Sequence, residues 1–446
     1  MKNITKSLTL ISALILASCS ESIDDIVAYD ATGAPAKSVN YEKISIEEAI
    51  DIANNFYNTG INSRAAEHIS VDVCNVQFLT TFNSRANLAD TLIYVLNYEN
   101  DNGFAIISAK KSSSPILAVI DNGNFKNVFD THNPMFDSFI NSAKLYVLQG
   151  DSEYVSSSDT PKSRNDFGLE LTPATGEKVE VDTLYRDILA PKLGDLFWGQ
   201  KGYEGSLCPN SIAGCSPLAI AMACYHFKEP ANIEYTYPEH EINSEIIPWS
   251  EFSKHSNNPK FGVCFTCSQY THSSLARVIR EIGYRAKTKY EEGASGTSTA
   301  EIKKTLTNVL NTRRINGFYD YSKDGIRNAL KDGLVIISGR SGSYEHGIFT
   351  PNDDKGHTWI ADGYRYVEVE KKKYMRDSPT SDWIFVEKYV QHDDLIHFNL
   401  GWNGNGNGYY SSSVFTIRNP NAWDSDEKEF YVEYSYFSDA KYLTIQ

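Results

Sequence analysis

The chain has 446 residues, which is enough for about two or three domains. Its formal net charge of -15 argues against a nucleic-acid partner, because binding to phosphates requires a basic face. Aromatic residues make up 12% of the chain, and this content suits a β-rich protein outside the cytoplasm.

The N-terminus predicts export and lipidation. Two lysines precede a mostly apolar run over residues 7–17, which is too short to span a bilayer as a helix. Leu16-Ala17-Ser18-Cys19 then resembles a bacterial lipobox, in which the cysteine is acylated and the preceding residues are removed. We expect residues 1–18 to be a lipoprotein signal peptide and Cys19 to anchor the protein in the bacterial cell envelope, at the outer membrane or cell surface. Processing could later release the protein from this anchor. An ordinary signal peptide that contains Cys19 is the alternative.

The next part of the chain predicts a tether over residues 19–40 and an α+β domain over residues 41–150. Apolar residues at helical spacing predict two helices, and alternating or apolar runs bounded by turn residues predict three strands. The expected helices are 44–57 and 135–148, and the expected strands are 92–96, 104–108 and 115–120. Residues 151–178 are polar, lack periodicity and contain basic residues, so they read as a linker open to proteolysis, with an insertion loop as the alternative.

The remaining residues, 179–446, predict a helical half followed by a sheet half, which indicates an α+β enzyme with a cleft between them. Expected helices begin at 215 and lie near 273–282 and 299–310, and expected strands are 334–338, 357–364 and 395–400. The pair Cys264 and Cys267 has no second Cys or His pair at ligand spacing, so we expect ordinary thiols or a local disulfide and no metal site.

The most informative position is Cys215, which opens a small-residue apolar run after Gly214. At the first turn of a helix, a cysteine meets the positive end of the helix dipole and unpaired N–H groups, and both favour the thiolate. Pro217 fits in that turn because its missing N–H would have no partner there. A cysteine nucleophile requires this kind of support, although a buried structural cysteine remains the alternative from this segment alone.

Two later stretches supply a base and an amide for such a nucleophile. His357 stands where a glycine turn at Gly356 becomes a strand, so its ring can project from the strand edge. Asn399 is the amide that would accept from the histidine N–H and fix its tautomer, and Trp402 would shield that bond from water. The order Cys, His, Asn along the chain is that of papain-like chemistry.

These motifs resemble those of the streptopain family of secreted bacterial cysteine proteases. The resemblance rests on Gly214-Cys215 with Ala219 and Ala221, on Gly356-His357-Thr358-Trp359-Ile360-Ala361-Asp362-Gly363, and on His397-Phe398-Asn399-Leu400-Gly401-Trp402-Asn403-Gly404. It implies a papain-like α+β fold preceded by an α+β propeptide domain that acts as inhibitor and is removed by cleavage in the linker. It also implies protein or peptide substrates and no cofactor.

The resemblance adds further site residues. Phe197-Trp198-Gly199-Gln200 fits the family segment that supplies an oxyanion glutamine, which points to Gln200. A small-residue loop near the cleft is matched around Ser295, and we expect substrate contacts from Gly214, Gly356, Trp402 and Ser295.

The chain departs from the family pattern at Leu400, where a tryptophan is usual, and at Asn403, where a glycine is usual. The first change predicts the loss of an aromatic wall of the cleft. The preferred function is a cysteine endopeptidase with Cys215, His357, Asn399 and Gln200 as catalytic residues. The alternatives are a catalytically weak pseudo-protease or adhesin, and an acyl-transfer enzyme that uses the same Cys–His pair.

Overall fold

A computed structural model describes residues 43–58, 73–80, 91–150 except 132, 176–252 except 239, 269–291, 294–345, 348–416 except 377 and 379, and 440–446. Residues 42–446 form one compact unit. The expected signal peptide, Cys19, the tether, most of the linker, Cys264 and Cys267 lie outside the described residues. No helix in the described ranges is long and apolar enough to cross a membrane.

The N-terminal part contains the elements that periodicity predicts. Its helices are α1 (Ile46–Asn58), α2 (Phe125–Phe129) and α3 (Pro134–Gln149), and its strands are β1 (Val73–Thr80), β2 (Thr91–Tyr98), β3 (Phe104–Ser108) and β4 (Ile116–Ile120). α3 begins where expected because the Asn133 side chain accepts from the Met135 N–H at 3.0 Å, while Pro134 occupies the first turn. Strands β1 to β4 pair in sequence order, each antiparallel to the next.

The helical half of the C-terminal part is built around α5 (Cys215–Phe227), in which every residue from Ser216 to Cys224 is buried. α5 contacts α7 and α8 and also strand β12 of the sheet. Small side chains along α5 permit this close packing on several sides. The other elements of this half are α6 (Trp249–Phe252), α7 (Gln269–Arg285), α8 (Thr299–Val309), β6 (Asn232–Glu234), β7 (Ser244–Ile246), β8 (Lys289–Glu291) and β9 (Ala294–Gly296).

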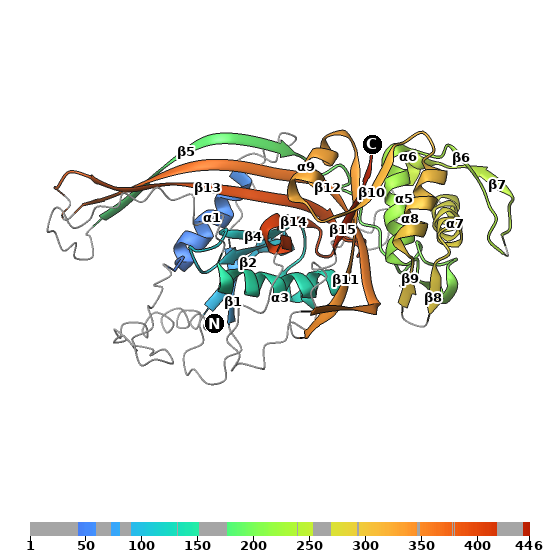
Figure 1. Cartoon of the computed structure of the whole chain (residues 1–446), viewed down its shortest axis with the longest axis horizontal. Coiled ribbons are helices and arrows are strands. Elements are labelled where there is room, and N and C mark those ends of the chain that lie inside the picture. Colours follow the sequence, from blue (N-terminus) through green and yellow to red (C-terminus); the bar gives the residue numbers. More distant parts are fainter. Residues whose placement is uncertain are drawn as a thin grey trace, which may run out of the picture. The chain divides into compact units, whose positions relative to one another are not determined.

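The other half is a large antiparallel sheet in the order β1-β2-β3-β4-β14-β13-β12-β11-β15-β10, with β5 paired to β12 (Figure 1). Its C-terminal strands are β5 (Gly176–Leu189), β10 (Ile315–Asp320), β11 (Leu334–Glu345), β12 (Ile348–Arg376), β13 (Ile384–Asn399), β14 (Gly408–Ser411) and β15 (Lys441–Ile445), and α9 (Lys323–Asp332) precedes β11. The expected α+β class, with a helical half and an antiparallel sheet half, is confirmed.

The sheet joins the two parts of the chain that we expected as separate domains. Strand β4 of the N-terminal part pairs with β14, and the Asp121 N–H donates to the Asn407 carbonyl at 3.0 Å. One buried core is shared across this join. In it the Phe139 ring meets the Tyr410 ring edge to face, with centroids 4.8 Å apart. The N-terminal part is therefore integrated into the sheet by both hydrogen bonds and apolar contacts.

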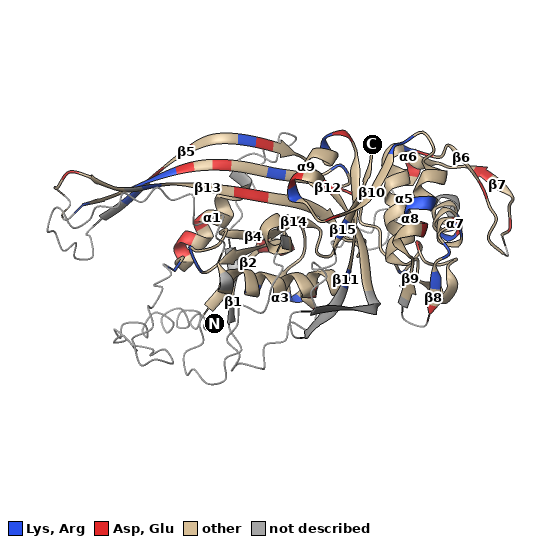
Figure 2. Ribbon diagram, viewed as in Figure 1, with Lys and Arg blue, Asp and Glu red and all other residues tan. Residues whose placement is uncertain are grey.

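Strands β12 and β13 extend well beyond the expected strands 357–364 and 395–400, and β5 was not expected from the sequence. Beyond the core, β12 and β13 continue as a paired ribbon rich in charged residues (Figure 2). Cross-strand ion pairs line it, such as Lys388 with Glu370 at 2.5 Å and Lys372 with Asp182 at 3.2 Å. Because these pairs are largely exposed, each contributes little to stability. Parts of the ribbon do alternate, as in Val367-Glu368-Val369-Glu370, but the charged run Lys371-Lys372-Lys373 that follows is not typical of a strand.

Candidate active site

Cys215 is the first residue of α5, as the sequence predicts, and it is partly exposed. Gly214 before it has φ 84°, in the region that favours glycine. A Cβ on Gly214 would lie 2.4 Å from the Ser295 Oγ, so the expected small-residue loop packs directly against the residue before the nucleophile. The thiol consequently sits at the positive end of a rigid, buried helix.

The structure brings Cys215 and His357 together. Burial alone would raise the pKa of the Cys215 thiol, but a hydrogen bond from His357 and the charge of its ring outweigh burial, so that the pKa lies below its ordinary value. The backbone N–H of Thr358 and the Ser216 hydroxyl add smaller contributions in the same direction. This pairing is the arrangement in which a thiolate and an imidazolium stabilise each other.

The His357 ring is held on several sides. Its Nε2–H donates to the Leu400 carbonyl at 3.2 Å, which leaves Nδ1 as the nitrogen available to the thiol. The Trp402 ring meets the imidazole edge-on with centroids 5.9 Å apart, and Trp359 stacks at the same separation. His357 is itself buried, so its orientation is fixed by the protein and not by solvent.

Asn399 does not occupy the position that we expected. Its Nδ2 donates to the Leu196 carbonyl at 2.7 Å, and its Oδ1 accepts from the Gly401 N–H at 3.1 Å. In the described residues it makes no hydrogen bond with His357, because the carbonyl of Leu400 takes that place. Asn399 instead fixes the turn that carries this carbonyl, so the structure corrects the role from direct partner to support.

The Leu400 side chain also differs from expectation. It is fully buried in the shared core, where a Cβ on Gly406 would lie 3.0 Å from it. The Leu400 side chain therefore points into the core and does not stand where an aromatic wall of the cleft was expected. Asn403 has φ 56°, a conformation that asparagine tolerates better than most residues, which explains how it substitutes for the usual glycine.

The segment of Gln200 lies beside the nucleophile. The Ala213 N–H donates to the Gln200 carbonyl at 2.7 Å, and Gly199 forms an antiparallel bridge with Trp402. The Asn403 N–H donates to the Trp198 carbonyl at 3.1 Å. The chain that carries Gln200 is thus fixed between the start of α5 and the turn after β13, where an oxyanion donor would be required.

Comparison with known proteins gives the family. Residues 198–410 match the Peptidase C10 family, and residues 41–147 match the Spi protease inhibitor. Residues 198–410 of the chain belong to the peptidase C10 family. The resemblance to streptopain-type cysteine peptidases read from the motifs is thereby confirmed, with an inhibitory propeptide domain before the peptidase domain.

Two relatives of this C10 chain are informative. The thiol protease/hemagglutinin PrtT of Porphyromonas gingivalis is 21% identical over 350 residues, which cover 73% of this chain and 34% of that protein. The chain thus spans about a third of the length of this curated relative. A solved fragment of prointerpain A from Prevotella intermedia is 18% identical, covers 83% of this chain and 98% of that one, and has a TM-score of 0.46.

Two polar residues of the C10 motifs have roles that the sequence reasoning missed. Asp362 accepts from the Leu193 N–H at 2.7 Å and from His397 Nδ1 at 2.6 Å. On its other side, His397 Nε2 donates to Asp121 of the propeptide domain at 2.9 Å. Burial opposes the charged ring, but the two carboxylates raise the pKa of His397 to about 10. Asp362 and His397 both lie inside the motifs that carry the family resemblance, which could have indicated a role. Their partners Leu193 and Asp121, however, are far away in the sequence.

Another predicted position, Gly356, directly precedes His357 on strand β12. Gly356 is exposed and pairs with Arg340 across β11 and β12. Burial raises the pKa of the thiols of Cys208 and Cys224, which makes both poor nucleophiles. Within the described ranges, no three His, Cys, Asp or Glu side chains gather so as to hold a metal ion.

Proposed function

We propose that the protein is the lipid-anchored zymogen of a cysteine endopeptidase that hydrolyses peptide bonds of protein substrates. The observation that carries the proposal is the partly exposed Cys215 at the start of α5, whose thiol is hydrogen-bonded to His357 and has a pKa below its ordinary value. Buried cysteines without such a partner, such as Cys224, have the opposite shift.

The proposed reaction begins with attack of the Cys215 thiolate on a peptide carbonyl, which forms a C–S bond and moves charge to the carbonyl oxygen. The Cys215 backbone N–H and the Gln200 side chain would hold this oxyanion, at about 3 kcal/mol per donor. His357 then protonates the leaving amine as the C–N bond breaks. Water, deprotonated by His357, finally hydrolyses the thioester and restores the thiolate.

The Leu400 carbonyl supports this sequence of proton transfers. It accepts from His357 Nε2–H, and so it favours the ring orientation that directs Nδ1 at the thiol. Asn399 and Asn407 in turn hold the Leu400 turn, since the Leu400 N–H donates to the Asn407 Oδ1 at 2.9 Å. Both are positioning residues.

We further propose that residues 41–150 inhibit the peptidase until the linker over 151–178 is cut. The match to an inhibitor family and the shared sheet support this role. The lipobox-like Leu16-Ala17-Ser18-Cys19 supports anchoring through Cys19. Incorporation of a labelled fatty acid that is lost in Cys19→Ser would support the anchor, and incorporation that persists in this variant would refute it.

The test of the peptidase function is the full chain, activated by an added protease that cuts the linker and is then removed, beside Cys215→Ala treated in the same way, with Cys208→Ala as the matched control in a buried thiol. We expect casein hydrolysis and labelling by an epoxide inhibitor of papain-like enzymes in the parent and the control only. Mass spectrometry of the products should show new peptide termini, whereas cross-links or deamidation would indicate acyl transfer. Casein hydrolysis that persists undiminished in Cys215→Ala would overturn the proposal.

A further inference from the structure

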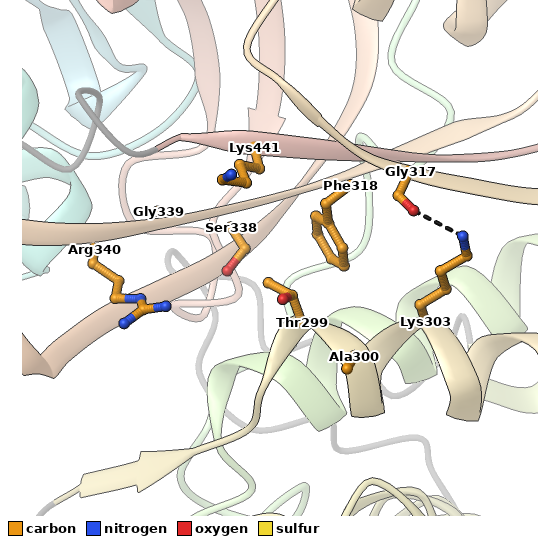
Figure 3. A pocket seen from close by; sticks show the side chains of 9 residues that line it. All are labelled: Thr299, Ala300, Lys303, Gly317, Phe318, Ser338, Gly339, Arg340 and Lys441. Carbon is orange, nitrogen blue, oxygen red and sulfur yellow. Dashed lines mark hydrogen bonds between the residues drawn. The ribbon is translucent and has the colours of Figure 1, made fainter. Parts of the chain in front are cut away.

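A cavity of about 450 Å³ is lined by strands β10, β11 and β15 and by the first turns of α8 (Figure 3). One of its walls is strand β11, in which Ser338 and Gly339 line the cavity. In the ladder between β11 and β12, Ser338 is paired with Thr358 and Gly339 with His357. Since paired strands lie about 4.8 Å apart, the cavity wall is one strand away from the catalytic histidine.

Side-chain contacts link the same wall to the nucleophile. The Thr358 hydroxyl donates to the Ser338 Oγ at 3.4 Å and lies 3.0 Å from the Ser216 Oγ. The opposite wall begins at Thr299, directly after the loop in which Ser295 packs against Gly214. An extended peptide advances about 3.3 Å per residue, so the two residues next to the cleaved bond lie within about 7 Å of it, a length similar to the separation of one strand between His357 and this wall.

The lining of the cavity is basic. It contains Lys303, Arg340 and Lys441 and no acidic residue, and Figure 3 shows these three side chains around the Phe318 ring. The cavity thus combines an apolar surface with positive charge, which matches a side chain that has a short apolar stem and a carboxylate end.

Lys303 is a half-buried cation of this lining. Its ammonium donates to the Gly317 carbonyl at 2.8 Å, and no carboxylate of the described residues pairs with it. Lys441 lies 3.6 Å from Asp320, but the exposed fractions of the two side chains are 43% and 86%, so this pair is weak. A ligand carboxylate would supply the counter-charge that the half-buried Lys303 lacks.

We propose that this cavity is a substrate subsite that selects Glu or Asp within two residues of the cleaved bond. The proposal rests on the proposed peptidase function and assigns its substrate class. A glutamate would place its methylene groups against Phe318 and its carboxylate near Lys303, while Lys441 on the other side of the ring adds positive charge. A basic side chain would be repelled, and an apolar one would desolvate Lys303 without giving it a partner.

The test uses the activated full chain and fluorogenic peptides that differ only in Glu, Gln or Lys at each of the two positions on either side of the cleaved bond. At one position we expect kcat/KM for Glu to exceed that for Gln by about 10-fold, as for a charge-assisted hydrogen bond. This preference should weaken at high salt. Lys303→Gln should abolish it and leave hydrolysis of the Gln peptide within about 3-fold, while Lys303→Arg should keep it. Lys304→Gln, at an exposed neighbour on α8, is the matched control.

The outcomes separate this inference from the function on which it rests. If Gln peptides are cleaved as fast as Glu peptides at every position, or if the preference survives in Lys303→Gln, the acidic subsite is refuted and the peptidase stands. Epoxide labelling of Cys215 without turnover of any Glu peptide also refutes the subsite. If neither turnover nor labelling occurs, the proposed function fails, and the subsite fails with it.

Discussion

The contact between His397 and Asp121 predicts that one carboxylate of the propeptide domain holds this domain on the peptidase. Asp121→Asn removes the negative charge beside the His397 ring and keeps an oxygen that can accept the hydrogen bond from Nε2–H. Loss of one partner from a fully buried ion pair costs about 3–5 kcal/mol. Here Asp362 stays in place at 2.6 Å, and the exposed fraction of the Asp121 side chain is 30%, so screening reduces the loss. We expect the free energy of unfolding to fall by about 1–2 kcal/mol.

The measurement is urea unfolding of the full chain in the Cys215→Ala background, which prevents self-cleavage. Asp130→Asn, at an exposed position of the same domain, is the control and should change little. Because the pKa of His397 is raised from 6.5 to about 10, its ion pairs contribute fully below pH 6.5, and their contribution is lost as the pH rises through 10. The effect of Asp121→Asn should therefore be largest near pH 6 and small near pH 10. No effect at pH 6, or an effect that grows with pH, would refute the reasoning.

Three further predictions follow from buried residues near the site. Burial raises the pKa of Glu204 to about 7, so the free energy of unfolding should fall as the pH rises from 4.5 to 7. In urea unfolding, Glu204→Gln should therefore stabilise the chain by about 1–3 kcal/mol at pH 8 but not at pH 4. In the same assay, Leu400→Trp should destabilise the chain by about 3 kcal/mol because the core has no room for the larger ring, whereas Leu400→Met should cost about 1 kcal/mol. A higher kcat/KM in the tryptophan variant would instead support a role of this position in the cleft. Asn399→Ala should lower the free energy of unfolding by about 2–4 kcal/mol and lower kcat, but the pH profile of kcat/KM should keep its shape. A shift of its acidic limb would mean that Asn399 acts on His357 directly.

The elements with strong periodicity were predictable from the sequence. The α5 start at Cys215, the helix over Pro134–Gln149 and the strand over Phe104–Ser108 all depend on local signals, namely small apolar residues, a capping Asn and an apolar run between turns. The pairing of Cys215 with His357 was also predictable, since the chemistry of a thiolate requires a base.

The residues whose contacts were not predicted depend on distant partners. The Asn399 amide donates to the Leu196 carbonyl, which is 203 positions away, and the sequence does not show that this carbonyl, and not His357, is its partner. Asp121 and His397 are 276 positions apart, and only the pairing of β4 with β14 brings them together. The long ribbon of β12 and β13 was missed for a different reason, because charged runs such as Lys371-Lys372-Lys373 interrupt the alternation of apolar and polar residues that marks a strand.

The pairing of β4 with β14 separates two events that are often treated as one, the cutting of the chain and the departure of the propeptide. A cut in the linker leaves the backbone ladder and the shared apolar core intact, so the severed domain stays in place until something pulls it away or digests it. Its departure uncovers an unpaired strand edge at β14 and aromatic surface that includes Tyr410, a combination that invites association with other strands. The freshly released enzyme should therefore be at its most prone to self-association, and new propeptide or substrate backbone should compete for that edge.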